Sequence, residues 1–453
     1  MTAVSPGTVA VDKRGLAEQM LDARRRTELL LRPVDDDRLM TQHDPLLSPL
    51  VWDYGHIAAY EELWLVQRLS GRAPINEERM HLYDAFEKPR RVRGSLPLMT
   101  RPEVEAYRDR VDGLALELLD EADMDGADPL LRHGFVYEMI VQHEHQHQET
   151  ILQALQMLPG GYRPDAALAS QVAHSAPLPH AVTAASRPPA PSMVAVAGGR
   201  YPIGATGHGP HDNERPRHEV SLAAYRIDRF PVTCGDFAGF IADGGYRRAE
   251  LWTDTGWAWR LESGAEAPLY WRREGDSCVT ERFGESARID WRTPVIHVCW
   301  YEADAYARWA GKRLPTEFEW EVAAGWDPAL GRTRRFPWGD QPPTADLANL
   351  DHARLGCATA GAHPLGASAL GCEQMVGDVW EWTSSDFLPY PGFTAFPYRE
   401  YSEVFFGSDH RVLRGASCAS RSSVARVTFR NWDYPIRRQI FAGFRCAADG
   451  DEP

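Results

Sequence analysis

A nine-residue stretch, Gln142–Thr150, is rich in side chains that bind metals: it holds three histidines and two glutamates. His143 and His147 are four residues apart, so on a helix both imidazoles leave one face and can hold a single metal ion. His145 points away from that face, and Gln146 flanks it. Because the stretch lies within an apolar-striped segment, a solvated helix surface explains it poorly. The spacing therefore predicts a metal site.

A third ligand is offered upstream by His56, which lies among apolar neighbours in Ser48–Ile57. A lone histidine of this kind is ordinarily a core residue, but a facing helix with two ligands needs one more donor. Three neutral imidazoles leave coordination positions open, as oxygen-activating iron requires. The spacing alone does not separate iron from zinc.

A zinc protease is the alternative interpretation, because His143, Glu144 and His147 also fit the HExxH pattern with Glu144 as the base. That pattern is short, and it needs a further ligand downstream. Residues 148–164 offer only Glu149. The upstream histidine is therefore the better third ligand.

The histidines must be positioned by helices, and residues 1–160 show apolar spacing near 3.6. Prolines open three of the expected helices, where the first turn tolerates them, and Gly160 and Gly161 are expected to end the last one. Four helices with polar connections predict an antiparallel bundle, which builds metal sites from inward-facing side chains. The expected helices are Leu16–Leu31, Pro49–Leu69, Pro102–Leu119 and Pro129–Met157.

The rest of the chain has a different texture. Residues 161–191 are rich in alanine and proline and are expected to form a linker. Residues 192–453 hold most of the 15 tryptophans and alternate short apolar stretches with Gly, Pro, Asp and Asn. The interpretation is an α+β protein whose second domain contains much irregular structure. Its clear helical segments are Thr233–Asp243, and Trp300–Trp309 with a companion at Thr316–Ala324.

Bulk properties exclude several classes of protein. A chain of 453 residues suggests more than one core. The net charge of −15 argues against nucleic-acid binding, which needs a basic surface. The start resembles no signal peptide, and no apolar run is long enough to span a membrane. The seven cysteines are widely spaced without a CxxC pair, so neither disulfides nor a zinc ribbon is expected. Cytoplasm is the expected location.

Eight stretches of the sequence together resemble a known family, the ergothioneine-biosynthesis sulfoxide synthases, also called hercynine oxygenases. The N-terminal part is similar to their DinB-like bundle. The C-terminal part is similar to their formylglycine-generating-enzyme domain, which has a C-type-lectin-like fold. The resemblance covers nearly the whole chain, and its stretches are Ser48–His56, Leu82–Phe86, His143–Thr150, Asp212–His218, Arg313–Trp320, Phe336–Gly339, Gly377–Trp382 and Arg430–Arg437.

The resemblance implies a non-haem iron(II) oxygenase with Fe(2+) on His56, His143 and His147. Its small-molecule partners would be O2, hercynine (Nα-trimethylhistidine) and a thiol, which in the closest subgroup is γ-glutamylcysteine. The product would be a sulfoxide with the new bond on the imidazole carbon between the two nitrogens. Three alternatives stay open: a selenoneine synthase that uses a selenium donor such as a selenosugar, a zinc-dependent DinB-like hydrolase or thiol transferase, and a non-catalytic lectin-like binding module, which the complete histidine set argues against.

By the same resemblance, Gln146 would contact the bound histidine derivative, while Asn431 and Trp432 would recognise the trimethylammonium group. That group cannot take part in a hydrogen bond, and an aromatic face attracts it through cation–π interaction. Tyr398 would donate a proton or hydrogen during the oxygen step. Tyr401 is the second member of the family's tyrosine pair. Without the family, these aromatic residues would pass as packing.

The donor carries two carboxylates and an amine, and it calls for arginines and one acid. The matching positions are Arg90 and Arg93 in a basic turn, and Asp433 and Arg437 four residues apart. Arginine forks bind carboxylates bidentately, and Asp433 would hold the amine. A solvated basic turn is the competing interpretation, most strongly for Arg91.

One departure from the family concerns Arg414–Cys418, which reads Arg-Gly-Ala-Ser-Cys where the family usually reads Arg-Gly-Gly-Ser-Trp. The loss of a large flat side chain leaves the donor, sulfur or selenium, open. Cys418 also suggests the copper–thiol chemistry of formylglycine-generating enzymes. No second cysteine lies close to it in the sequence, since Cys446 is far along the chain, so this interpretation is weak.

Overall fold

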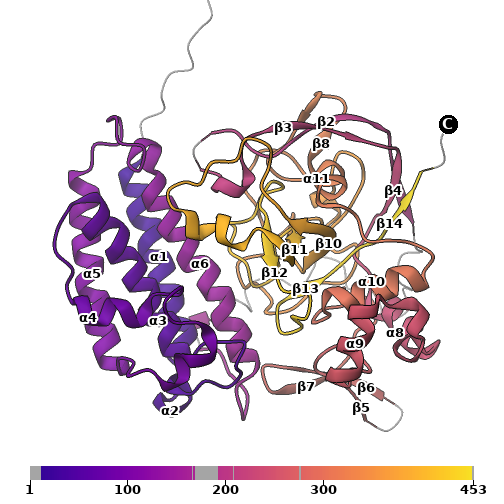
Figure 1. Ribbon diagram of the computed structural model, residues 1–453, viewed down its shortest axis with the longest axis horizontal. Helices are drawn as coiled ribbons and strands as arrows, with labels where there is room; N and C mark the ends of the chain where they lie inside the picture. Colours follow the sequence, from indigo (N-terminus) through magenta and orange to yellow (C-terminus); the bar gives the residue numbers. More distant parts are fainter. Residues whose placement is uncertain (1–11, 166, 169–191, 208, 275–276, 451–453) are drawn as a thin grey trace, which may run out of the picture. The chain divides into compact units, whose positions relative to one another are not determined.

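The computed structural model describes residues 12–165, 167–168, 192–207, 209–274 and 277–450. The chain forms two compact units (Figure 1). Unit 1 comprises Met1–Asp165 with Gly207–Gly209, and unit 2 comprises Ala166–Thr206 with Pro210–Pro453. Most of the expected linker, residues 169–191, lies outside the described residues.

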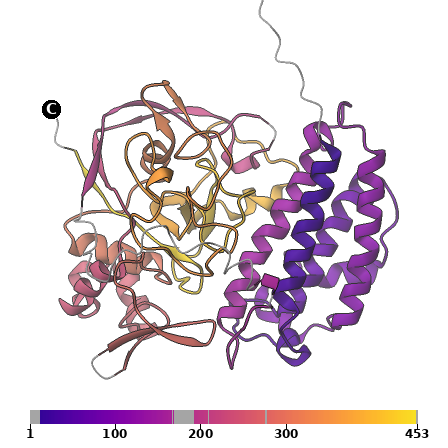
Figure 2. The same cartoon turned by 180° about the vertical axis from the view of Figure 1, so that it is seen from behind.

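Unit 1 is a bundle of four long helices that lie side by side in both views (Figures 1 and 2). Helix α1 packs against α6, and α3 packs against both α5 and α6. Leu30, Val51, Val111 and Ile151, one from each long helix, are at most 1% exposed. The helices are α1 (Lys13–Leu31), α2 (Asp36–Met40), α3 (Leu50–Glu61), α4 (Glu77–Met80), α5 (Arg101–Glu121) and α6 (Phe135–Gln156).

The predicted bundle is confirmed, and local sequence signals explain the start of α5. Thr100 and Glu103 form a capping box, and Pro102 occupies the first turn. The end of the predicted second helix is different, because Glu62–Leu69 continues α3 as a π-helix. An apolar stripe does not reveal this wider turn, which closes hydrogen bonds five residues apart.

The predicted bounds of the last helix, Pro129–Met157, are wrong at the start. Helix α6 begins at Phe135 because His133 and Gly134 have φ of 57° and 74°, a left-handed conformation that breaks a right-handed helix. It ends at Gln156, before Gly160. The histidine segment lies in the middle of this helix, where its backbone is regular.

Unit 2 contains several small sheets rather than one large one. The central sheet has the order β12-β11-β10-β13; β10 pairs antiparallel with β11 and parallel with β13. Its strands are β10 (Trp380–Phe387), β11 (Gly407–Arg414), β12 (Asn431–Asp433) and β13 (Ala442–Gly443). The other strands are β1 (Met193–Val196), β2 (Gly199–Ile203), β3 (His218–Leu222), β4 (Tyr225–Asp228), β5 (Trp271–Glu274), β6 (Ser277–Arg282), β7 (Glu285–Arg288), β8 (Trp326–Asp327), β9 (Arg332–Thr333) and β14 (Ala447–Asp449).

Helices of unit 2 pack on an aromatic core that includes Phe237, Phe240 and Trp382, all at 0% exposure. Three of the helices match the predicted segments. Helix α9 was not predicted. Thr253 caps its start, but the helix buries only Gly256 and so shows no apolar stripe. The helices are α8 (Cys234–Ala242), α9 (Asp254–Ser263), α10 (Trp300–Trp309) and α11 (Glu317–Gly325).

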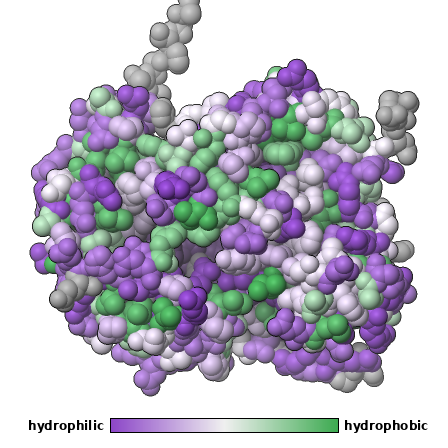
Figure 3. All heavy atoms as spheres, viewed as in Figure 1, coloured by the Kyte–Doolittle hydropathy of each residue, from purple (hydrophilic) through white to green (hydrophobic). Residues whose placement is uncertain are grey.

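The surface carries mixed side chains. On the face drawn in Figure 3, hydrophilic side chains are spread over both units between smaller hydrophobic patches. Among the described residues, no helix is both long and apolar enough to cross a membrane.

Candidate metal centre and substrate-recognition residues

Three histidines meet inside unit 1. His56 comes from α3, and His143 and His147 lie one turn apart on α6. Their ring centroids are 4.5–5.1 Å apart, and one ring nitrogen from each falls within 4.8 Å of the other two. His145 is buried on another side of the helix and does not belong to this cluster. The sequence-predicted ligand set is thus brought together by two packed helices.

Two of the three rings are held through Nδ1. The Nδ1 of His56 lies 2.6 Å from the backbone oxygen of Tyr83, and the Nδ1 of His147 lies 2.9 Å from Oδ1 of Asp53. If each Nδ1 donates its proton there, each Nε2 keeps its lone pair for a metal. Asp53 is 1% exposed, so this carboxylate is a fixed orienting group.

Aromatic rings hold the cluster from outside. The ring of Tyr60 stacks on His143 with centroids 3.7 Å apart, and Trp52 stacks on His56 at 4.6 Å. The guanidinium of Arg93 in turn lies 3.4 Å from the centre of the Trp52 ring. These contacts fix the ring planes, so the cluster is shaped before any metal binds.

The electrostatic setting favours neutral imidazole. Burial, followed by the charge of His147, lowers the pKa of His56 well below its usual value. A neutral ring is the form that binds a metal ion. Three imidazoles with two orienting oxygens therefore fit a divalent transition metal, and zinc and iron both accept such a set.

Asp53, Tyr60 and the backbone oxygen of Tyr83 were missed by the sequence analysis. The two side chains could have been found from their spacing. Asp53 lies three residues before His56 and Tyr60 lies four residues after it, so both share its helix face. The carbonyl of Tyr83 lies in a 3-10 turn, His81–Tyr83, and carries no signal in a side chain.

The basic turn divides into exposed and buried arginines. Arg90 is exposed, whereas Arg93 is 5% exposed and its nitrogens bond to Lys88 O, Ser48 Oγ and Ala85 O. Burial lowers the pKa of Arg93 to about 9. These contacts hold the guanidinium of Arg93 against Trp52, and its predicted binding of a donor carboxylate stays a prediction.

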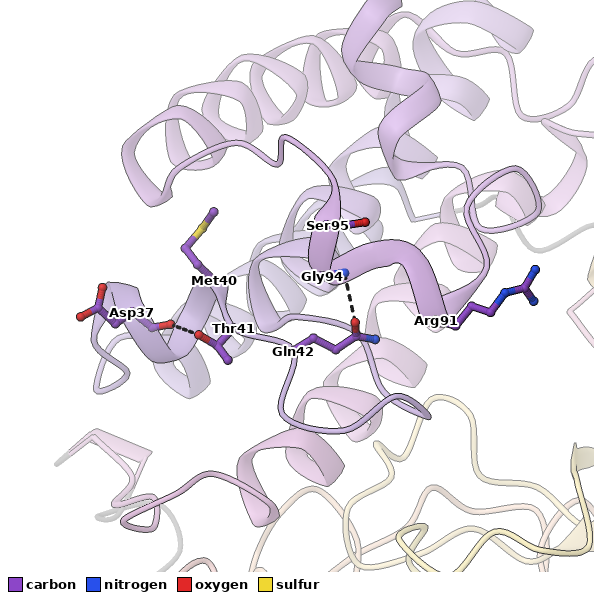
Figure 4. Close-up of a pocket in the computed structure, with 7 residues that line it drawn as sticks. All are labelled: Asp37, Met40, Thr41, Gln42, Arg91, Gly94 and Ser95. Carbon is purple, nitrogen blue, oxygen red and sulfur yellow. Dashed lines mark hydrogen bonds between the residues drawn. The ribbon is translucent and has the colours of Figure 1, made fainter.

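Arg91 extends beside an open hollow of about 720 Å³ in unit 1 (Figure 4). In this hollow the Oε1 of Gln42 accepts a hydrogen bond from the Gly94 N–H. Its other lining residues are Asp37, Met40, Thr41 and Ser95, so the histidine cluster is not part of it.

The predicted hercynine contact, Gln146, is half-buried on α6, and its side-chain amide donates to the backbone oxygen of Gln142 at 3.3 Å.

The remaining predicted residues lie in unit 2, where three aromatic rings form one group. Tyr401 meets Tyr398 and Trp432 edge to face, at 6.2 and 5.9 Å. One face of Trp432 is covered by Phe387, whose ring stacks on it at 4.2 Å. Both tyrosines are partly exposed as residues, but the hydroxyl of Tyr401 is buried, and burial raises the pKa of Tyr401 well above its usual value.

Strand β12 also carries Asn431 and Asp433. The Oδ2 of Asp433 pairs with Nε of Arg437 at 3.4 Å, and Arg437 is 3% exposed. The side-chain oxygen of Asn431 accepts from the N–H of Trp432. The predicted acid and arginine are thus brought together as an ion pair.

A buried network holds the tyrosine-bearing loop, residues 396–402. Asp212 accepts from the Ser402 hydroxyl at 2.5 Å and from the Phe396 N–H at 3.3 Å. The ring of His211 stacks on Tyr401 at 4.5 Å. No role for His211 or Asp212 was predicted from the sequence.

Comparison with known families matches both units. Residues 19–151 match the DinB superfamily, and residues 179–450 match the sulfatase-modifying factor enzyme 1-like domain. These matches confirm the predicted fold class, a helical bundle followed by a domain of the formylglycine-generating-enzyme type.

Several curated proteins are similar over almost their whole length. The chain is 48% identical to the hercynine oxygenase of Mycolicibacterium thermoresistibile, over 98% of this chain and 97% of the relative. It is 46% identical to the hercynine oxygenase of Mycolicibacterium smegmatis, over 97% of this chain and 100% of the relative. It is also 46% identical to the hercynine oxygenase of Mycobacterium tuberculosis, over 96% of this chain and 98% of the relative. A solved structure, PvdO from Pseudomonas aeruginosa, is 22% identical and covers 59% of this chain and all of its own, with a TM-score of 0.40.

Proposed function

The chain belongs to the hercynine oxygenase family, and from this premise we propose that it uses iron(II) and O2 to join hercynine to a thiol. The new bond would form at the imidazole carbon between the two nitrogens, and γ-glutamylcysteine is the donor proposed. The reaction balances: hercynine, thiol and O2 give the sulfoxide and water, with one oxygen atom in each product. The observation that carries the proposal is the histidine cluster, with ligand atoms within 4.8 Å of one another.

Iron(II) fits this donor set. Held by three neutral imidazoles, it would retain open coordination positions and supply the redox chemistry for oxygen activation. His56, His143 and His147 would hold it, and Asp53 with the Tyr83 oxygen would fix two of the rings. A buried carboxylate on the second nitrogen of a ligand histidine makes that histidine a stronger donor.

Recognition of hercynine is assigned to Gln146, Asn431 and Trp432. Trp432 presents a ring braced by Phe387 and Tyr401, which suits a trimethylammonium group because that group offers only charge and apolar surface. Arg90, Asp433 and Arg437 are assigned to the donor, whose carboxylates suit arginine and whose amine suits Asp433. Tyr398 is assigned the proton donation.

A selenium donor is the second candidate for the same site. It is favoured by Cys418, which stands where the family usually has tryptophan. The hercynine chemistry would be unchanged, and only the donor atom would differ. Donor competition separates the two.

The experiment that tests the function compares metals. Protein stripped by a chelator is reloaded with iron(II) or zinc(II) and given hercynine, γ-glutamylcysteine and oxygenated buffer. We expect oxygen uptake that requires both substrates, and only with iron(II). Turnover with zinc(II) and no oxygen uptake would contradict the proposal and favour a hydrolase or thiol transferase.

A further inference from the structure

Two cysteines far apart in the sequence meet in unit 2. Cys418 follows β11 and is 1% exposed, while Cys357 lies in a loop and is partly exposed. The Cys357 thiol and the Cys418 N–H both bond to the backbone oxygen of Asp378, so the two residues lie next to each other. All seven cysteines of the chain carry free thiols. The partner that the sequence did not reveal for Cys418 is thus supplied by the fold.

A single residue, Asp378, anchors both cysteines. Its backbone oxygen accepts from the N–H of Cys418 at 3.0 Å and from the Cys357 thiol at 3.7 Å. Its carboxylate accepts from the Ala358 N–H at 2.6 Å and from the Asn349 amide at 2.7 Å. Asp378 is 0% exposed, so the pair is held in place rather than met by chance.

We propose that Cys357 and Cys418 form a redox pair that closes reversibly to a disulfide when the protein meets a small-molecule disulfide. The two thiols lose two electrons and two protons in all. The external disulfide accepts them, its sulfur–sulfur bond breaks, and two small thiols leave. The protein's link reopens by the reverse exchange with excess thiol.

The order of attack follows from exposure. Partly exposed Cys357 meets the external disulfide first and forms a mixed disulfide, and buried Cys418 then displaces the small thiol. The hydrogen bond with Cys418, followed by burial, raises the pKa of Cys357 well above its usual value. Because the thiolate is the attacking species, closure should be slow near neutrality and faster as the pH rises.

A metal site is the competing use of two thiols. Among the residues that the structure describes, the one group of three or more metal-binding side chains is the histidine cluster of unit 1. No third ligand therefore joins the cysteines, and the pair lacks the closed shell that structural zinc needs. Disulfide closure requires no further residue.

The consequence of closure is a cross-link beside the central sheet. It would tie the loop that carries Cys357 to the segment that follows β11, and β11 pairs with β12, the strand of Asn431 and Trp432. A link between residues far apart in the chain restricts the unfolded state and stabilises the fold, provided that the native geometry accepts it.

The test uses the folded wild-type chain and oxidised glutathione at mildly alkaline pH, followed by alkylation and peptide mapping without reduction. We expect a Cys357–Cys418 peptide lighter by two hydrogens than its reduced parts, reversal by dithiothreitol, and a higher melting temperature. Cys278→Ser, which removes another partly exposed thiol, should behave like the wild type. Cys357→Ser should give no internal link.

Two results would overturn the proposal. One is a wild-type protein in which Cys278 takes up glutathione but no Cys357–Cys418 peptide forms. The other is a link that forms only after the chain has been unfolded. Neither depends on hercynine turnover, so the outcome is independent of the proposed function.

Discussion

At the scale of single residues, the histidine cluster makes a sharp distinction within one helix. His143 and His147 lie on the face of α6 that meets the ring of His56 from α3, whereas His145 faces elsewhere and is 5% exposed. His143→Ala or His147→Ala should abolish metal retention and turnover. His145→Ala should keep the metal, although loss of a buried ring costs about 1–3 kcal/mol of stability. Metal analysis of the purified variants decides, and equal metal loss in His145→Ala would refute the ligand assignment.

Asp53 is expected to tune metal affinity without touching the metal. Its carboxylate holds Nδ1 of His147 at 2.9 Å, so Asp53→Ala frees the ring to turn. Loss of such an outer partner typically weakens metal binding about 10–100-fold. Asp53→Asn, which keeps one oxygen in place, should lose less. The measurement is calorimetric titration with iron(II) or cobalt(II), with exposed Asp120→Ala as the control. Equal affinity of Asp53→Ala and the control would contradict this role.

Tyr398 tests mechanism rather than binding. Tyr398→Phe keeps the ring that packs against Tyr401 and deletes only the hydroxyl. If that hydroxyl donates the proton, oxygen uptake should continue while the thiol is released as its sulfinic acid. A tenfold change in partition needs only about 1.4 kcal/mol. The ratio of sulfoxide to sulfinic acid is read by mass spectrometry. An unchanged ratio with intact turnover would remove Tyr398 from the mechanism.

Much of the histidine cluster could be predicted from the sequence, because its three members lie on two helices with readable spacing. The groups that hold the histidine rings were harder to predict. Asp53 could have been found on the face of His56, but a backbone oxygen such as that of Tyr83 leaves no mark in the sequence. In unit 2, Asp212 and Ser402 meet across 190 residues, and no local pattern joins them.

At the scale of elements, helix existence was predicted better than helix limits. The apolar period of α1, α3, α5 and α6 reports burial of one face, which tertiary packing preserves. The start of α6 was missed because a favourable proline at position 129 competes with the left-handed turn at His133 and Gly134. The π-helix over Glu62–Leu69 changes the hydrogen-bond register but not the apolar composition.

The turn Asp212–Glu214 and His211 before it should make unit 2 sensitive to acid. Burial, followed by the charge of Arg426, lowers the pKa of His211 from 6.5 to about 3. Between pH 6.5 and 3, His211 is therefore protonated in the unfolded chain but neutral in the folded chain. Stability is full above pH 6.5 and is lost as the pH falls toward 3, by a total on the order of 3–5 kcal/mol.

His211→Phe keeps an aromatic ring against Tyr401 and cannot titrate. Its free energy of unfolding should fall less steeply between pH 6.5 and 4 than that of the wild type. Urea unfolding at a series of pH values measures both slopes. Parallel slopes for the variant and the wild type would show that His211 is not the group responsible.

At the scale of the whole molecule, the proposed roles are divided between the units. The three histidines and Gln146 lie in unit 1, and Asn431, Trp432 and Tyr398 lie in unit 2. The family resemblance was visible in the sequence because its stretches are short and contiguous. The identity of the donor could not be predicted in the same way. The proposed donor-binding residues are few, and Cys418 departs from the family's usual sequence.

The most direct test of the central claim uses hercynine carrying deuterium on the ring carbon between the two nitrogens. Iron-loaded protein receives it with γ-glutamylcysteine, a competing selenosugar and O2, and the products are resolved by mass spectrometry. We expect a product with the mass of the labelled hercynine plus γ-glutamylcysteine plus one oxygen, less the deuterium and one hydrogen. Hercynine that keeps its deuterium, while oxygen is consumed only to oxidise the thiol, would contradict it.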